Sequence, residues 1–172
     1  MVILGIAYGV DSFYGASILV DGEIVASQVE SGCCLTLPKN LIESVLARSG
    51  KDISNVDYVA FLGKPLSYFE QLIKLHMESF PRKHFKFFGD FRDFFSNKIR
   101  VKSALKKELG FCRDLCYVEP TDAIAYQMID KGKMAAVVLS DVLSVRAGGL
   151  YQKKDDSLWL VKEFSIKDFP ES

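Results

Sequence analysis

The pattern of apolar and polar positions at the start of the chain predicts three short strands. Apolar runs of strand length cover Val2 to Ala7, Ala16 to Val20 and Ile24 to Val29, and turn residues bound them. Asp21-Gly22, between the second and third runs, is a strong signal for a two-residue hairpin, because both residues tolerate positive φ. We therefore expect the chain to open with antiparallel strands.

The next stretch changes to helical spacing. Apolar residues three and four positions apart predict a helix that ends near Gly50; they are Leu41, Ile42, Val45 and Leu46. Later apolar runs predict strands at Asn55 to Phe61, Asp114 to Glu119 and Met134 to Leu139, with a helix over Asp122 to Asp130. This order predicts an α/β fold with a mixed sheet, in which three antiparallel strands are followed by parallel strands.

A long segment from residue 65 to residue 110 separates two of the predicted strands. Its phenylalanines follow helical spacing, and Pro81 divides it, so we interpret it as a helical insertion. From Arg82 to Glu108 the segment contains nine basic residues and three acidic ones. Basic residues among aromatic ones suit single-stranded nucleic acid, a membrane surface or a partner helix. Of these we favour a protein partner or a covered cleft, and we expect neither nucleic acid nor membrane binding.

Composition and charge limit the classes of partner and the cellular location that we expect. In 172 residues, 22 Lys and Arg balance 22 Asp and Glu, so the net charge gives no argument for a polyanionic partner. The first strand follows Met1 without a secretion leader, and no stretch approaches a membrane span, so we expect a cytoplasmic protein. The cysteines are Cys33, Cys34, Cys112 and Cys116. We expect reduced thiols and no bound metal at these positions.

The first turn, Tyr8 to Ser12, carries the most suggestive chemistry. It places the carboxylate of Asp11 and the hydroxyl of Ser12 at a strand end. Gly9 and Gly15 permit the close backbone approach that a phosphate-like group needs. The alternative interpretation is an ordinary edge of an antiparallel sheet.

Several segments, taken together, point to one family. They are Ile3-Leu4-Gly5-Ile6, Asp11-Ser12, Leu19 to Ala26, Val56 to Phe61, Lys64-Pro65-Leu66, Phe69-Glu70, Val118-Glu119 and Ala135 to Asp141. In this order and spacing, and over essentially the whole chain, they resemble the carbamoyltransferases of antibiotic and nodulation-factor biosynthesis. The resemblance implies a ribonuclease-H-like, actin-like ATPase fold, which the N-terminal part of that family has.

The resemblance also implies a reaction. In that family a carbamoyl group passes from carbamoyl phosphate, through a carbamoyl-adenylate made with ATP, to a hydroxyl of a sugar or antibiotic. Such chemistry needs cations at the phosphate oxygens and placed bases. Asp11, Ser12 and Asp141 are then remnants of the phosphate and nucleotide site. We expect no cofactor for the isolated chain, and ATP with a divalent metal if a partner completes the site.

The chain departs from the family at its histidines. Val10 stands before Asp11, where the family has histidine. Pro120, Thr121 and Ile124 stand where the family has three metal-binding histidines. Proline and isoleucine have no donor atom, and a hydroxyl is a weak ligand compared with imidazole. The metal site of the family is therefore not expected here.

Other family motifs are altered as well. Val142 follows Asp141 in place of glycine, and its branched side chain obstructs a phosphate. The charged stretch after the third strand is shortened to Gln28 to Cys34. The histidines of this chain, His76 and His84, lie in the insertion, and we interpret them as surface or packing residues. We expect no intact catalytic set.

The end of the chain predicts a hairpin from Ala147 to Tyr151 and Ser157 to Val161. We interpret Ala147-Gly148-Gly149 as a turn rather than a phosphate loop. Residues 1–133 are then a first actin-like domain with the insertion at 65–110, and residues 134–172 begin the second half. Because the nucleotide of this fold lies between two halves, these residues form at most part of its site. Unpaired strand edges favour a homo-oligomer or a protein partner.

Three functions stay open. The first is a carbamoyltransferase-like domain that is inactive alone and acts as a binding or regulatory subunit, which the lost histidines favour. The second is the N-terminal part of a split or truncated O-carbamoyltransferase that uses carbamoyl phosphate and ATP. The third is a vestigial structural domain without a ligand.

Overall fold

The computed structural model describes residues 1–8, 13–32, 34, 36–65, 69, 70, 73, 77, 100–129, 133–138, 148–155 and 157–164. The chain divides into two compact units, Met1–Tyr117 and Val118–Ser172. Most of the insertion predicted at 65–110 lies outside the described residues. No helix within the described ranges combines the length and apolar character that a membrane crossing requires.

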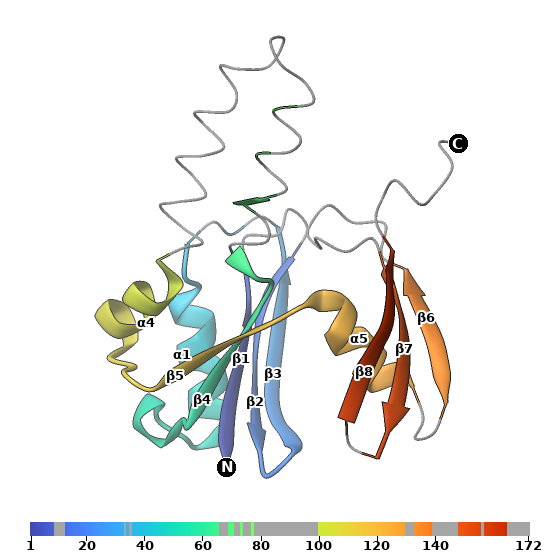
Figure 1. Ribbon diagram of the computed structural model, residues 1–172. Helices are drawn as coiled ribbons and strands as arrows, with labels where there is room; N and C mark the ends of the chain where they lie inside the picture. Colours follow the sequence, from blue (N-terminus) through green and yellow to red (C-terminus); the bar gives the residue numbers. More distant parts are fainter. Residues whose placement is uncertain are drawn as a thin grey trace. The chain divides into compact units, whose positions relative to one another are not determined.

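The first unit is built on a five-stranded mixed sheet (Figure 1). Its strands are β1 (Val2–Ala7), β2 (Phe13–Val20), β3 (Glu23–Ser31), β4 (Tyr58–Leu62) and β5 (Asp114–Val118), in the order β3-β2-β1-β4-β5. β2 is antiparallel to both β1 and β3, whereas β1 and β4 are parallel. The predicted sequence of antiparallel and then parallel strands is therefore confirmed.

The turn between β2 and β3 is the predicted two-residue hairpin. Asp21 has φ 51° and Gly22 has φ 93°, as a turn with positive φ at both central residues requires. The backbone N–H of Asp21 donates to the carbonyl of Met1 at 2.9 Å. The N-terminal ammonium group also hydrogen-bonds the Asp21 side chain and thereby lowers the pKa of that carboxyl group. The start of β1 is thus tied to this turn.

The strands of this hairpin are longer than the sequence pattern predicts. β2 begins at Phe13 and β3 continues to Ser31, and these two residues face each other in register. The next pair inward is Tyr14 and Glu30, and the Tyr14 hydroxyl donates to the Glu30 carboxylate. Such cross-strand pairs stabilise a sheet, which accounts for the extension beyond the apolar runs.

Two helices of the first unit end at glycines in the left-handed conformation. α1 (Lys39–Ser49) ends at Gly50, with φ 66°, as predicted, and α4 (Val101–Leu109) ends at Gly110, with φ 73°. Glycine adopts this conformation without a steric penalty. A short 3₁₀ helix, η1 (Ile53–Asn55), precedes β4.

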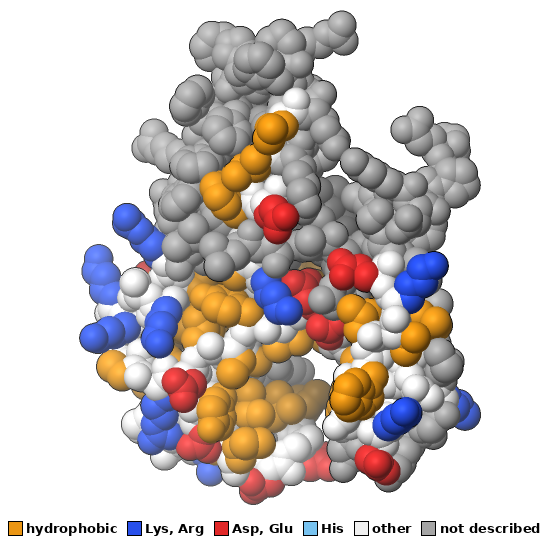
Figure 2. Space-filling view, in the orientation of Figure 1, with side chains coloured by type: hydrophobic (Ala, Val, Ile, Leu, Met, Phe, Trp, Pro, Cys, Tyr) orange, Lys and Arg blue, Asp and Glu red, His pale blue; other side chains and the backbone are white. Residues whose placement is uncertain are grey.

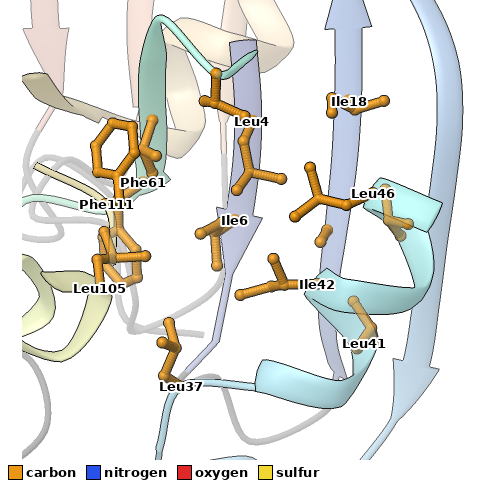
Figure 3. Close-up of a cluster of buried hydrophobic side chains, with 14 of the residues drawn as sticks. Leu4, Ile6, Ile18, Leu37, Leu41, Ile42, Leu46, Phe61, Leu105 and Phe111 are labelled. Atoms are coloured by element: carbon orange, nitrogen blue, oxygen red, sulfur yellow. The ribbon is translucent and has the colours of Figure 1, made fainter. Parts of the chain in front are cut away.

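The core of the first unit lies between the sheet and these helices (Figure 3). Leu4 and Ile6 are two positions apart in β1, so their side chains point to the same face of the sheet. α1 and α4 both pack on this face. The buried side chains from β2, β4 and the helices are Ala16, Ile18, Val59, Phe61, Leu41, Ile42, Val45, Leu46, Val101 and Leu105. The helical spacing in α1 thus predicts which residues of this helix are buried.

At the amino ends of the parallel strands, one carboxylate joins three segments. Asp57 accepts the backbone N–H of Val2 at 2.8 Å and the Arg113 guanidinium at 2.8 Å. Arg113 also donates to the carbonyl of Val56 at 3.2 Å. These contacts connect the start of β1 with the segments before β4 and β5.

The described residues of the second unit form a three-stranded antiparallel sheet and a helix. Its elements are α5 (Pro120–Met128), β6 (Met134–Val138), β7 (Gly148–Lys154) and β8 (Ser157–Phe164), with strand order β6-β7-β8. The predicted hairpin is confirmed as β7 and β8. The domain boundary predicted after residue 133 stays a prediction. It marks where the second half of the fold begins, whereas the division into compact units follows how the described elements pack, and α5 packs with the second unit.

Two details of the second unit differ from the sequence analysis. Gly148 and Gly149 are not turn residues; they pair within β7 with Val138 and Val137 of β6. The helix predicted from Asp122 begins two residues earlier, at Pro120. Proline suits a first helical position, since its fixed φ is helical and its missing N–H would have no partner inside the helix.

Candidate functional site

The predicted site residues belong to the turn after β1 and to the segment after β6. Asp11, Ser12 and Asp141 lie outside the described residues, as do His76 and His84. Their interpretation as site remnants and as surface residues therefore stays a prediction. What the structure describes is the framework next to them: β1 ends just before the first turn, and β6 ends before Asp141.

The carboxyl ends of β1 and β4 meet at the same edge of the first sheet. Ile6 of β1 lies opposite Phe61 of β4 in a parallel register. In open α/β sheets, ligands bind outside the carboxyl ends of the strands. The predicted phosphate turn follows β1 in the sequence, and its role as a ligand site stays a prediction.

A row of three aromatic rings occupies this edge. Tyr8, directly after β1, is almost fully buried. Its ring meets Phe61 edge to face, with 5.2 Å between centroids, and Phe61 meets Tyr117 in the same way at 6.1 Å. Edge-to-face pairs are favourable beyond the area that they bury. The row therefore gives the start of the predicted phosphate turn a rigid apolar support.

Burial raises the pKa of the Tyr8 phenol well above its ordinary value, and the nearby Glu108 carboxylate adds to the shift. Because the folded protein favours the neutral phenol, Tyr8 contributes stability below the unfolded pKa of about 10. This contribution is lost as the pH rises through the folded pKa. We expect Tyr8 to ionise at a higher pH than an exposed tyrosine in a titration followed by tyrosinate absorbance. The Tyr8→Phe variant should lack one of the late steps, and an unchanged titration would contradict the assignment.

Gly15, which the sequence analysis linked to phosphate approach, has a packing role in the structure. It lies within β2 opposite Val29 of β3. A Cβ atom at this position would lie 3.0 Å from the carbonyl oxygen of Gln28 and 3.1 Å from Val29 Cγ2. The close approach of β3 therefore accounts for glycine here.

The described end of the basic insertion is α4. Lys and Arg side chains gather over this helix on the face that Figure 2 shows. Lys102, Lys106 and Lys107 are exposed, while Leu105 faces the core. The interpretation of the whole insertion as a partner surface stays a prediction.

The first turn of α5 and the residue that follows it hold the three positions at which the resembled family has histidines. Pro120 begins the helix. Thr121 is fully buried, and its hydroxyl has no hydrogen-bond partner among the residues that the structure describes. Ile124 packs against a buried cluster formed by Ala125, Ile129 and Tyr151. These side chains form part of the helix start and the core of the second unit.

This turn does not fit a bound metal ion. Pro120 and Ile124 offer no donor atom, and the single hydroxyl of Thr121 is enclosed. Elsewhere in the described ranges, no three His, Cys, Asp or Glu side chains are grouped as ligands for a metal. These residues therefore do not supply the metal ligands that the reaction of the resembled family uses.

One polar contact in the second unit was not predicted. The Tyr151 hydroxyl of β7 donates to Oδ1 of Asp122 in α5 at 2.8 Å. The two residues lie on different elements and far apart in the sequence, so no local spacing could have indicated the pair. Asp122 also stands in the first turn of α5, where a carboxylate is favoured by the helix dipole.

Comparison at the level of sequence finds a partial match to a curated protein. No family model matches the chain. An uncharacterized protein of Synechocystis sp., sll1178, is 34% identical over 120 residues, which covers 64% of this chain. The chain matches only 19% of the length of that protein. The matched part is thus a small fraction of a much longer relative.

Solved structures show the fold. YeaZ from Pseudomonas aeruginosa has a TM-score of 0.53 and 18% identity, over 95% of this chain and 66% of that chain. The ROK hexokinase from Thermus thermophilus has a TM-score of 0.50 and 11% identity, over 92% of this chain and 47% of that one. Both are actin-like ATPase-fold proteins, so the predicted fold class is confirmed. At these identities, the likeness concerns the fold alone.

Proposed function

We propose that the chain is a cytoplasmic carbamoyltransferase-like domain that binds a ligand or a partner protein and does not transfer a carbamoyl group by itself. The first turn of α5 carries this proposal. Where the resembled family has metal-binding histidines, this chain has a helix-starting proline, an enclosed threonine and a core isoleucine. A regulatory or binding subunit can keep the fold of its relatives and does not need their metal ligands.

The proposal assigns separate roles to the other predicted residues. Asp11 and Ser12, in the turn after β1, and Asp141, after β6, are proposed to be the remnants of a phosphate and nucleotide region. ATP and a divalent metal are proposed to bind only when a partner protein, or a second copy, completes this region. In that case the aromatic row beside the first turn would hold its backbone for the incoming phosphate.

The proposal is tested with the purified chain, carbamoyl phosphate, ATP and Mg²⁺. We expect neither release of phosphate from carbamoyl phosphate nor exchange of labelled pyrophosphate into ATP above the rate without protein. An Asp11→Asn variant, purified in the same way, is the matched control for contaminating enzymes. Turnover by the chain that the variant loses would overturn the proposal, whereas equal turnover in both preparations identifies a contaminant.

Ligand binding separates a binding domain from a vestigial one. Thermal unfolding is measured with ATP, carbamoyl phosphate and Mg²⁺, alone and together. A ligand at 100 times its dissociation constant adds about 2.7 kcal/mol to stability, which a melting curve resolves. If Asp11 belongs to the site, Asp11→Asn should reduce the shift. A chain that no ligand stabilises and that captures no partner would be a structural domain.

A second candidate is the N-terminal part of a split or truncated O-carbamoyltransferase. The match to 19% of a longer Synechocystis protein supports only that such a chain can be part of a larger protein. Native mass spectrometry of the protein from its own source distinguishes the candidates. A complex with a second chain that restores carbamoyl transfer would support the split enzyme. A lone chain or a homo-oligomer without activity would support the binding domain.

A further inference from the structure

The second unit contains a pocket of about 640 Å³ that the proposed function does not use. It is lined by residues of α5, β7 and β8, and by the last residue of β5; they are Val118, Asp122, Ala123, Tyr126, Tyr151, Leu158 and Leu160. Small-molecule sites have volumes of roughly 300–1,000 Å³, mostly apolar walls and a few placed polar groups. This pocket has that size and composition.

One wall of the pocket is held in place by close packing. Tyr151 is 1% exposed and lies opposite Leu160 in the β7–β8 register. Gly149, two residues earlier, is on the same face of β7. A Cβ atom there would lie 2.7 Å from both Tyr151 Cε2 and Leu160 Cδ1. The ring and the leucine therefore fill the space that a side chain would take, and the Tyr151 hydroxyl is fixed by its bond to Asp122.

The polar groups of the pocket favour a positive charge. Among the described residues that line it, Asp122 is the only charged one, and a carboxylate accepts about four hydrogen bonds through its two oxygens. The ring of Tyr126, one helical turn along α5, already holds a cation: the Lys153 ammonium lies 4.1 Å from its centroid and donates to the Tyr126 carbonyl at 3.1 Å. Aromatic faces attract ammonium groups by their quadrupole.

We propose that this pocket binds a small organic cation with an apolar body, such as an arylalkylamine. The ammonium group of the ligand pairs with Asp122 and competes with Lys153 for the ring of Tyr126. Its apolar body lies against Leu158 and Leu160. This inference is independent of the proposed function, because it uses only residues that line this pocket.

The test compares 2-phenylethylamine with 2-phenylethanol, a neutral molecule of the same shape. The isotopically labelled full chain is titrated with each and followed by NMR. We expect the amine to shift the signals of Ala123, Tyr126 and Leu158 and to bind about tenfold more tightly than the alcohol, the usual effect of a charge-assisted hydrogen bond. Equal affinities, shifts confined to other residues, or no binding of the amine at millimolar concentration would each overturn the proposal.

A substitution then tests whether the Asp122 carboxylate is the group that pairs with the ammonium group of the ligand. Asp122→Asn keeps the size of the side chain and an acceptor for Tyr151, and it should lower the affinity for the amine about tenfold, to that of the alcohol. Asp114→Asn, at an exposed position of β5 in the other unit, is the matched control and should change nothing. An unchanged affinity of Asp122→Asn would overturn the proposal. The comparison of amine and alcohol needs no variant and decides the case if Asp122→Asn does not fold.

Discussion

Replacing Ile18 with alanine should lower the free energy of unfolding by about 3 kcal/mol. Ile18 is fully buried in β2 and lies opposite Leu4 of β1, in the centre of the first core. The variant loses the transfer free energy of the removed methyl and methylene groups, and it leaves a cavity between the sheet and α1 that the rigid strands can close only in part. Urea unfolding followed by circular dichroism measures the change.

Ile24→Ala is the matched control. Ile24 is in the next strand, β3, and is 66% exposed. Both changes replace isoleucine with alanine in the same antiparallel sheet, so the loss of strand propensity is similar in the two. The control should therefore stay within about 0.5 kcal/mol of the wild type. Equal losses in the two variants would show that Ile18 is not a core residue.

Gly149→Ala should destabilise the second unit by about 2 kcal/mol, a typical cost of overpacking. The new methyl group would lie 2.7 Å from Tyr151 Cε2 and from Leu160 Cδ1, closer than real Cβ contacts. The Tyr151 ring must then shift, which also weakens the hydrogen bond of its hydroxyl to Asp122. Thermal unfolding and the NMR signals of Tyr151 measure the effect, and a variant as stable as the wild type would contradict this packing.

A double variant tests whether the cost arises from the crowded contact. Leu160→Ala alone should cost little, because Leu160 is 37% exposed. Combined with Gly149→Ala, it removes one of the two side chains that the methyl group meets. The double variant should therefore recover part of the lost stability, which appears as a favourable coupling in a double-mutant cycle. Simple additivity would place the cause of the destabilisation elsewhere.

The sequence predicts the first unit well where a local rule decides the structure. Asp21-Gly22 has a backbone preference that few other pairs share, and Gly50 ends α1 in a conformation that favours glycine. Tertiary contacts decide the remaining details. β2 extends back to Phe13 because it pairs with β3, and Gly149 becomes a strand residue because β6 lies beside it. Neither pairing can be predicted from the local pattern of apolar and polar residues.

The candidate sites are less predictable, because they depend on residues brought together by the fold. Asp122 and Tyr151 meet through the packing of α5 on β7, which no spacing in the chain encodes. Resemblance to a family drew attention to Thr121, but only the structure shows that its side chain is enclosed. Sequence reasoning thus found the helix start that lacks the histidines of the resembled family, and it missed the contact between the neighbouring Asp122 and Tyr151.

The position of β1 in the sheet has a consequence for the order in which the protein is assembled. β1 pairs with β2 through a short connection, but its other edge pairs with β4, where Ile3 lies opposite Tyr58. Closing that longer loop costs more chain entropy and slows folding. A chain emerging from the ribosome would therefore form the β1–β2–β3 meander first, and β1 would keep an open edge until α1 and β4 have been synthesised.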